Sequence, residues 1–240
     1  MSEPLLETRG LGMRFGGVHA VRDLNFTLGE RELRCLIGPN GAGKSTFFKM
    51  LTGQLKPTSG AVLMRGEDVT GAEPHEIARR GVGIKTQVPS VFDGLTVREN
   101  LWLAVTRTHR GAQARAAVDA MLERVGLSGS ASRLVGQLAH GQRQWVELGV
   151  VLSTDPDLVL LDEPAAGMTD QEVLRTVELV RDINQTKALI VVEHDMQFIR
   201  MIASKVTVFN QGAILMEDDV EVVMHSPIVR DIYLGKQAAA

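Results

Sequence analysis

The sequence predicts an α/β fold, in which a mostly parallel β-sheet is covered by helices and interrupted by a helical insert. A glycine-rich loop at residues 38–46 lies between an apolar run that suits a strand and a stretch that suits a helix. Two further apolar runs, 158–161 and 188–192, are continuous rather than alternating, as expected for parallel strands buried on both faces. Residues 95–152, by contrast, have helical periodicity.

The part of the chain before the insert alternates short strands with turns. Residues 29–30 and 57–60 have the composition of turns and separate apolar runs. Strands are expected at 5–9, 18–28, 33–37, 61–65 and 83–86. Helices are expected at 46–51, directly after the glycine-rich loop, and at 75–80.

The patterns of apolar residues also predict the helices and strands of the insert and of the C-terminal part. Helices expected at 97–106, 113–125 and 142–152 make residues 88–155 a helical insert in the α/β core. An amphipathic helix is expected at 172–183, between the two continuous apolar strands. Strands at 206–209 and 213–216 flank Asn210-Gln211-Gly212, which is typical of a hairpin turn.

The glycine-rich loop fits the pattern G-x-x-x-x-G-K-[ST] in full. Glycines leave backbone N–H groups open to phosphate oxygens, and the positive end of the following helix adds to the attraction. Lys44 is expected to reach the β- and γ-phosphates, and Ser45 to coordinate Mg²⁺. The residues expected to bind the nucleotide here are Gly38, Pro39, Asn40, Gly41, Ala42, Gly43, Lys44, Ser45 and Thr46. The alternative is a glycine-rich turn without a ligand.

Acidic and polar side chains follow three of the expected strands. Asp162 and Glu163 end a buried strand, at the edge where doubly wound sheets bind ligands. We expect Asp162 to hold Mg²⁺ and Glu163 to polarise the attacking water. His194 follows the next strand and is expected to bond the γ-phosphate, whereas Gln87 is expected to contact Mg²⁺ or the water. Taken alone, His194 or Gln87 also fits an ordinary polar loop position.

A second small-residue turn leads into a helix at Leu138-Ala139-His140-Gly141-Gln142. The N-terminus of a helix after such a turn is an anion site. Since the first loop already accounts for the chain's own nucleotide, we expect Ala139, His140, Gly141 and Gln142 to contact the nucleotide of another subunit.

Composition narrows the class of protein. A net charge of −3 and only 4% aromatic residues argue against a nucleic-acid surface. No apolar run approaches the ~18 residues that span a bilayer, and the N-terminus lacks the pattern of a secretion signal. The single cysteine, Cys35, excludes a disulfide framework and favours a reducing compartment.

Five motifs, in this order and spacing, resemble the ATP-binding subunit of ABC transporters over essentially the whole chain. They are the glycine-rich loop at 38–46, Gln87, the segment 138–142, Asp162-Glu163 and His194. The resemblance implies a P-loop NTPase (RecA-like) core with an N-terminal antiparallel β subdomain and a helical insert subdomain. Residues 1–240 then form a single ABC ATPase domain, with the core at 1–87 and 156–240 and the helical subdomain at 88–155. ATP and Mg²⁺ are the implied cofactors.

The resemblance also implies partners. A second ABC ATPase subunit, identical or related, packs head to tail on the first with two ATP molecules between them. Separate transmembrane permease subunits hold the pair at the inner face of the plasma membrane, on the cytoplasmic side, and a solute-binding receptor acts indirectly. The resemblance implies that Phe15 takes the place of an aromatic residue that stacks on adenine. Without the resemblance, an apolar side chain such as Phe15 fits a position in the core equally well. The apolar residues expected to form a groove for a permease helix are Val88, Val91, Phe92 and Leu95.

Two departures from the family pattern bear on hydrolysis. Ala139 and His140 stand where a serine and a glycine are usual, so the hydroxyl donor to the opposing γ-phosphate is missing. Thr169 replaces a usual aspartate in the loop after Glu163. We therefore expect a heterodimer with a related ATPase and two unequal sites.

The cargo is inferred from residue patterns alone. Arg14-Phe15-Gly16-Gly17, the segment 163–168, the segment 192–196 and Tyr233-Leu234-Gly235 resemble uptake systems for branched-chain amino acids and urea. Residues 140–147 look closer to the urea branch, so a urea importer is expected and a branched-chain amino-acid importer is the alternative. A soluble ABC protein acting on ribosomes or DNA, and a P-loop kinase or GTPase, are the competing classes.

Overall fold

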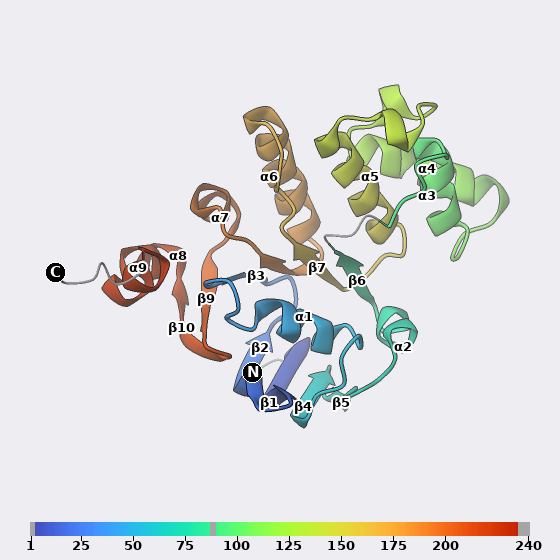
Figure 1. Ribbon diagram of the computed structural model, residues 1–240. Coiled ribbons are helices and arrows are strands. Elements are labelled where there is room, and N and C mark those ends of the chain that lie inside the picture. The colour runs from blue at the N-terminus through green and yellow to red at the C-terminus, as the bar shows by residue number, and fades with distance from the viewer. Residues whose placement is uncertain (1–2, 87–89, 235–240) are drawn as a thin grey trace.

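The computed structural model describes residues 3–86 and 90–234 and contains two β-sheets with helices packed around them (Figure 1). The smaller sheet has the strand order β2-β1-β4-β5, and each neighbouring pair is antiparallel. Its strands are β1 (Leu6–Phe15), β2 (Val18–Leu28), β4 (Ser59–Met64) and β5 (Glu67–Asp68). This sheet confirms the expected antiparallel N-terminal subdomain.

Strand β1 is longer than the predicted strand at 5–9. Its register with β2 shifts three times between Thr8 and Arg14, so the strand contains bulges. Gly10 lies at φ 56°, within this irregular stretch. Bulges break the two-residue alternation, which is why the second half of β1 was missed in the sequence.

The larger sheet has six strands in the order β10-β9-β3-β8-β7-β6. The strands from β9 to β6 run parallel, and β10 pairs antiparallel with β9. They are β3 (Leu33–Ile37), β6 (Val82–Lys85), β7 (Leu158–Asp162), β8 (Ala188–Val192), β9 (Lys205–Asn210) and β10 (Ala213–Asp219). Every residue of β3 and β8 is buried, which confirms the predicted α/β fold.

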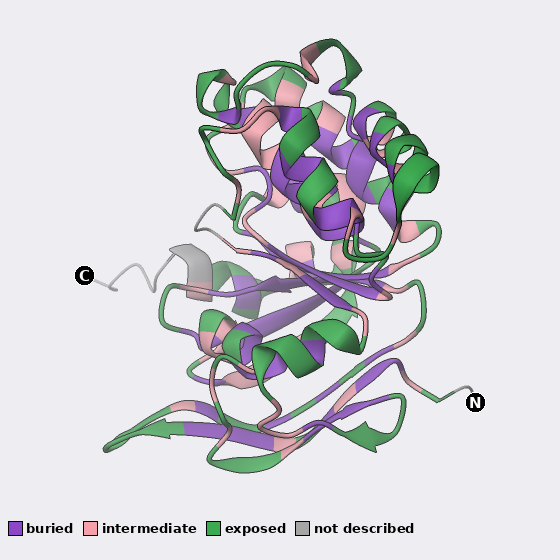
Figure 2. Ribbon diagram, turned by 90° about the vertical axis from the view of Figure 1, so that its right-hand side faces the viewer, coloured by how far each residue is buried: buried purple, intermediate pink, exposed green. Residues whose placement is uncertain are grey.

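Alternate residues of the larger sheet enter two different hydrophobic cores. Cys35 and Val191 pack with the helices on one face. Leu36 packs with the smaller sheet and with α1 (Lys44–Leu51) on the other. Phe47 of α1 is fully buried, and its ring centroid lies 5.5 Å from the centroids of Phe26 in β2 and Phe209 in β9. Helix α1 is therefore fixed between the two sheets (Figure 2).

The helical insert forms a lobe beyond the β6 edge of the larger sheet (Figure 1). Its helices are α3 (Val97–Val105), α4 (Gly111–Arg124) and α5 (His140–Leu152), each within two residues of its predicted bounds. Helix α2 (Pro74–Arg79) precedes β6. Thr96 begins α3 with a capping box that includes Glu99.

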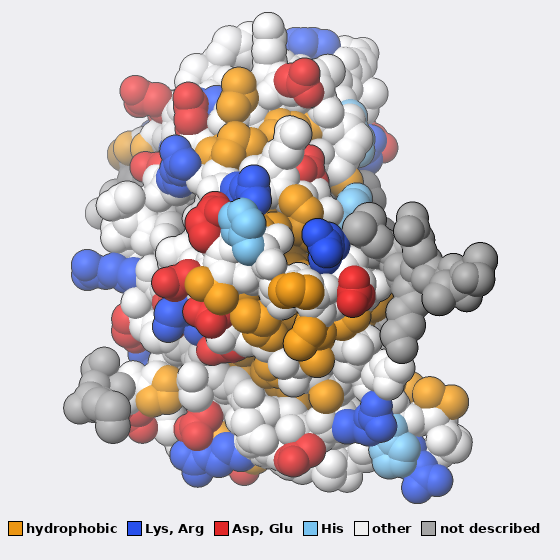
Figure 3. All heavy atoms as spheres, turned by 90° about the vertical axis from the view of Figure 1, so that its left-hand side faces the viewer, with side chains coloured by type: hydrophobic (Ala, Val, Ile, Leu, Met, Phe, Trp, Pro, Cys, Tyr) orange, Lys and Arg blue, Asp and Glu red, His pale blue; other side chains and the backbone are white. Residues whose placement is uncertain are grey.

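Four helices belong to the C-terminal part, namely α6 (Asp170–Asn184), α7 (Met196–Ile202), α8 (Val220–His225) and α9 (Pro227–Leu234). Only α6 was predicted, because the other three are too short for a clear apolar period. The face that carries α7–α9 and β10 has a group of hydrophobic side chains (Figure 3). Leu215, Val222 and Ile228 on these elements are exposed. Among the described residues, none of the helices has the length and apolarity needed to cross a membrane.

Candidate nucleotide site

The loop between β3 and α1 depends on glycine at two positions. Gly38 has a φ of 147°, and a Cβ atom placed on it would lie 2.2 Å from the carbonyl oxygen of Phe209. Gly43 has a φ of 104°, and its Cβ atom would lie 2.6 Å from the carbonyl oxygen of Ala20. Larger residues rarely adopt such φ values and would collide with backbone here, so the loop shape requires both glycines.

Lys44 is the first residue of α1, and its side chain turns back over the loop. Its Nζ atom donates hydrogen bonds to the carbonyl oxygens of Gly38 at 2.5 Å and Pro39 at 3.1 Å. Burial lowers the pKa of Lys44, while the charges of Glu163 and Asp162 act to raise it. The ammonium group is thus held beside the loop backbone and within the field of both carboxylates, as a phosphate-binding lysine needs.

One cavity joins the predicted phosphate-binding residues to the two carboxylates. Its lining consists of Phe15, Ala20, Asn40, Gly41, Ala42, Gly43, Lys44, Ser45, Thr46, Asp162, Glu163 and Val192. Phe15, at the end of β1, is 47% exposed. A core position for Phe15 is therefore excluded, and its stacking on adenine stays a prediction.

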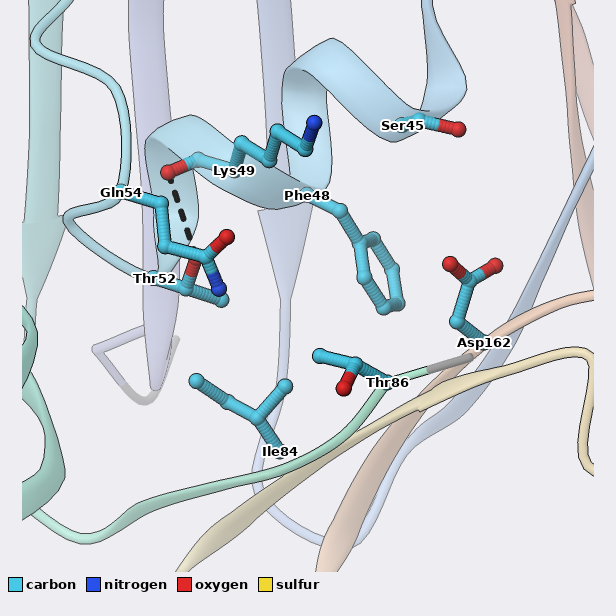
Figure 4. A pocket seen from close by; sticks show the side chains of 8 residues that line it. All are labelled: Ser45, Phe48, Lys49, Thr52, Gln54, Ile84, Thr86 and Asp162. Atoms are coloured by element: carbon cyan, nitrogen blue, oxygen red, sulfur yellow. Dashed lines mark hydrogen bonds between the residues drawn. The ribbon is translucent and has the colours of Figure 1, made fainter. Parts of the chain in front are cut away.

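Ser45 and Asp162 also line a second cavity, which extends from the start of α1 toward β6 (Figure 4). Burial raises the pKa of Asp162 and the charge of Glu163 raises it further, while Lys85 and Lys44 lower it. A hydroxyl and a carboxylate are the hard oxygen donors that Mg²⁺ prefers. In the part of the chain described, three or more His, Cys, Asp or Glu side chains nowhere gather as metal ligands. This pair fits Mg²⁺, which usually takes few protein ligands and completes its shell with phosphate and water.

Glu163 follows β7 with a φ of 47°, in the left-handed region that residues other than glycine seldom adopt. Its backbone N–H donates to the carbonyl oxygen of Val192 at 2.9 Å. Its Oε1 atom lies 3.5 Å from Nδ1 of His194, and the His194 side chain is 67% exposed. The two side chains meet because β7 and β8 are neighbouring parallel strands that end at the same edge.

The element at residues 139–142 begins α5 and borders a different cavity. Ala139 is the N-cap of α5 and makes no side-chain hydrogen bond there. The Nε2 atom of His140 lies 3.0 Å from the carbonyl oxygen of Ala166. This cavity is lined by Ala139, His140, Trp145, Gly167, Thr169, Gln171 and Glu172. This cavity and the cavity at the phosphate loop have no lining residue in common.

The carboxylate of Glu172 lies against the N-terminus of α5. A Cβ atom on Gly141 would lie 2.3 Å from Oε1 of Glu172. The same Glu172 forms a capping box with Thr169 at the start of α6. Thr169 therefore has a structural role as the N-cap of α6, which explains a hydroxyl at this position. The acid stabilises the positive ends of two helices together.

Gln87 and Val88 lie outside the described residues. The preceding residue, Thr86, lines the cavity of Figure 4 together with Ser45 and Asp162. The contact of Gln87 with metal or water therefore stays a prediction.

Three buried charged residues near the site were not predicted from the sequence as functional residues. Lys85 ends β6, Glu147 lies in α5 and Glu193 follows β8, and each is at most 3% exposed. All three interrupt or end apolar segments. A charged residue within or at the end of an apolar segment could have indicated their importance, because a buried charge needs an opposite charge or hydrogen bonds to stabilise it.

A mostly parallel sheet with a phosphate-binding loop and paired carboxylates at its carboxyl edge defines a P-loop NTPase. The family model described as "ABC transporter" matches residues 21–166. The chain belongs to the ABC transporter family and is an ATP-binding, ATP-hydrolysing component of it.

The relatives and solved structures match along nearly the whole chain. The high-affinity branched-chain amino acid transport ATP-binding protein LivG of Escherichia coli is 38% identical over 98% of this chain and 100% of its own length. BraF of Pseudomonas aeruginosa, with the same description, is 36% identical over the same shares. An ATP-binding cassette of an ABC transporter in its ADP conformation superposes with a TM-score of 0.87 at 26% identity, covering 97% of this chain and 99% of that one. CbiO1 of Clostridium perfringens has a TM-score of 0.85 at 25% identity, covering 98% and 96%.

Proposed function

We propose that this chain is the ATP-hydrolysing subunit of a multi-subunit importer for branched-chain amino acids. The observation that carries the proposal is the similarity to LivG and BraF from end to end. The expectation of a urea importer has no support among these relatives, so the alternative of the sequence analysis becomes the proposal. Binding ATP closes a dimer of ATPase subunits and hydrolysis reopens it, which changes the access of the permease.

Within the site, each residue has a proposed task. The backbone of the loop at 38–46 and Lys44 hold the phosphates, and Phe15 stacks on the adenine. Ser45 and Asp162 would hold Mg²⁺, which neutralises charge on the phosphates when bound. Glu163 polarises the attacking water, and His194 hydrogen-bonds the γ-phosphate.

The second half of each site would come from another ATPase subunit. Residues 139–142 begin a helix at a cavity away from their own phosphate loop, so a partner's nucleotide is the ligand that they can reach. Because Ala139 lacks the usual serine hydroxyl, we propose a heterodimer with a related ATPase. Equal rates of hydrolysis at both sites of the native complex would contradict this arrangement.

The permease would bind at the start of the helical lobe. Phe92 is 60% exposed, and Val91 and Leu95 beside it are half-buried. An apolar side chain this exposed suits a groove for a permease helix. The chain would then lie on the cytoplasmic face of the membrane, held there by the permease and coupled indirectly to a solute-binding receptor.

The proposal is tested with the complex purified from its native cells and placed in lipid vesicles. Receptor loaded with leucine is expected to stimulate ATP hydrolysis. Receptor incubated with urea instead is expected to leave the rate unchanged. The Glu163→Gln variant is expected to retain ATP and to accumulate closed dimers without hydrolysis. Urea bound to the co-purified receptor would overturn the amino-acid assignment, and normal hydrolysis by Glu163→Gln would overturn the role of Glu163.

A further inference from the structure

Glu193 is a buried acid between two loops of the nucleotide site. Its side chain is 1% exposed. The Oε2 atom accepts hydrogen bonds from the backbone N–H groups of His194 at 2.9 Å and Asp195 at 3.3 Å. The Oε1 atom accepts the N–H of Ala165 at 3.3 Å. One carboxylate thus binds the backbone on both sides of the gap between the ends of β7 and β8.

These bonds matter because of the turn that carries Glu163. Glu163 has left-handed backbone angles, which cost free energy unless the surroundings hold them. On one side, the N–H of Glu163 bonds the carbonyl oxygen of Val192. On the other side, the N–H of Ala165 bonds Glu193, and Pro164 between them has no N–H to offer. Two consecutive residues, Val192 and Glu193, therefore bind the turn on both sides of the Glu163 side chain.

The same carboxylate also fixes the residue opposite. The backbone N–H of His194 donates to Oε2 of Glu193, which helps to hold the His194 backbone in place. The Nδ1 atom of His194 lies 3.5 Å from Oε1 of Glu163. Glu193 is itself anchored to the sheet, since its N–H reaches the carbonyl oxygen of Leu36 in β3 at 3.4 Å. The Glu193 side chain thus contacts both the turn that carries Glu163 and the loop that carries His194.

We propose that Glu193 is a positioning residue for ATP hydrolysis, which holds the Glu163 turn and the His194 loop in one arrangement. The proposal rests on the proposed roles of Glu163 and His194. A carboxylate suits this task because both of its oxygens accept hydrogen bonds. A glutamine in its place offers one accepting oxygen and turns an NH₂ donor toward an N–H donor, so one of the two loops is released.

The test compares ATP hydrolysis by the assembled complex of ATPase subunits with the ATP affinity of this full-length chain. Glu193→Gln is expected to lower kcat by about 10- to 100-fold, because small misplacements of reacting groups have effects of this size. The affinity for ATP, measured by calorimetry, is expected to change less than about twofold, because the phosphate loop keeps its contacts. Glu193→Asp retains the charge and stays next to His194 but falls short of Ala165, so a similar loss of kcat is expected. If Glu193→Gln fails to fold, Glu193→Asp carries the test alone.

A matched control and a double variant make the test specific. Glu217→Gln removes an acid that bonds Thr207 and pairs with Arg34, away from the phosphate loop, and is expected to leave kcat unchanged. In the Glu163→Gln background, Glu193→Gln is expected to reduce the residual rate by a much smaller factor than in the unsubstituted protein, since the part of its effect that acts through Glu163 is already lost. Full activity of both Glu193 variants would overturn this inference alone, whereas full activity of Glu163→Gln would overturn the proposed role of Glu163. A parallel fall in ATP affinity and kcat would show a merely structural role.

Discussion

The Nζ atom of Lys85 lies 3.9 Å from Oε2 of Glu147, and both side chains are at most 3% exposed. Burial lowers the pKa of Lys85 and raises the pKa of Glu147, and each charge partly reverses the effect on the other. The Oε1 atom of Glu147 makes no hydrogen bond within the described structure. The pair links β6 of the core to α5 of the helical lobe, at the cost of two desolvated charges.

Removing one member of this pair is expected to harm the protein more than removing both. Lys85→Met leaves Glu147 buried without the charge of Lys85 and should lower the free energy of unfolding by about 3 kcal/mol. The double variant Lys85→Met/Glu147→Met should recover most of that loss, because apolar side chains of similar size replace both charges. Denaturant unfolding of both single variants and the double variant measures the difference. Additive effects would contradict a coupled pair.

Lys44 and Lys49 lie in the same helix, but only Lys44 bonds the phosphate loop. Lys44→Ala is expected to weaken ATP binding by about 100-fold, since a charged contact to phosphate is lost. Lys49→Ala, which removes an exposed lysine, serves as the control and should retain the affinity. Calorimetric titration with ATP decides, and unchanged binding by Lys44→Ala would remove the basis of the phosphate-loop assignment.

The sequence predicted those parts of the fold whose signals are local or strongly periodic. The continuous apolar runs of β7 and β8 and the helices of the insert were found close to their observed bounds. Bulges in β1 and the short helices α7–α9 were missed, because neither gives a sustained period. The order of the strands could not be read from the chain, since pairing joins segments as distant as β3 and β8.

The candidate site divides in the same way. The phosphate loop was identified because its glycines, Lys44 and Ser45 are fixed by spacing along the chain. Glu193 was identified only as part of a motif, because its partner Ala165 lies 28 residues away along the chain and meets it only in the fold. Burial likewise separates the two readings of Phe15, which is exposed beside the phosphate loop rather than packed in a core.

Ala139 offers a substitution with two independent measurements. As the N-cap of α5 it makes no side-chain cap, so Ala139→Ser should raise the free energy of unfolding by about 1 kcal/mol. If residues 139–142 contact a partner's γ-phosphate as proposed, the new hydroxyl should also raise kcat by about 10-fold. Ala139→Gly, which has no hydroxyl, is the control for the change in kcat. A more stable variant with an unchanged rate in the assembled dimer would show that this position reaches no phosphate.

Glu172 makes the stability of the protein depend on pH in a predictable direction. The N–H and hydroxyl of Thr169 hold the pKa of Glu172 below its ordinary value, with smaller contributions from the N–H of Gly141 and the charge of His140. Because the pKa is lower in the folded state than in the unfolded state, this contribution is present in full above the ordinary pKa of about 4.3. It is lost as the pH falls through the lowered value.

Glu172→Gln should therefore lower the free energy of unfolding by about 1 kcal/mol at pH 7, because glutamine can keep the capping box but loses the negative charge at the positive ends of two helices. The difference from the unsubstituted protein should shrink as the pH falls through the lowered pKa of Glu172, where the carboxylate becomes protonated. Glu178→Gln removes an acid in the same helix that pairs with Arg175 at the surface, and it should show at most a small difference at any pH. Denaturant unfolding at a series of pH values measures all three proteins. A difference that stays constant down to pH 3 would mean that the charge of Glu172 does not stabilise these helix ends.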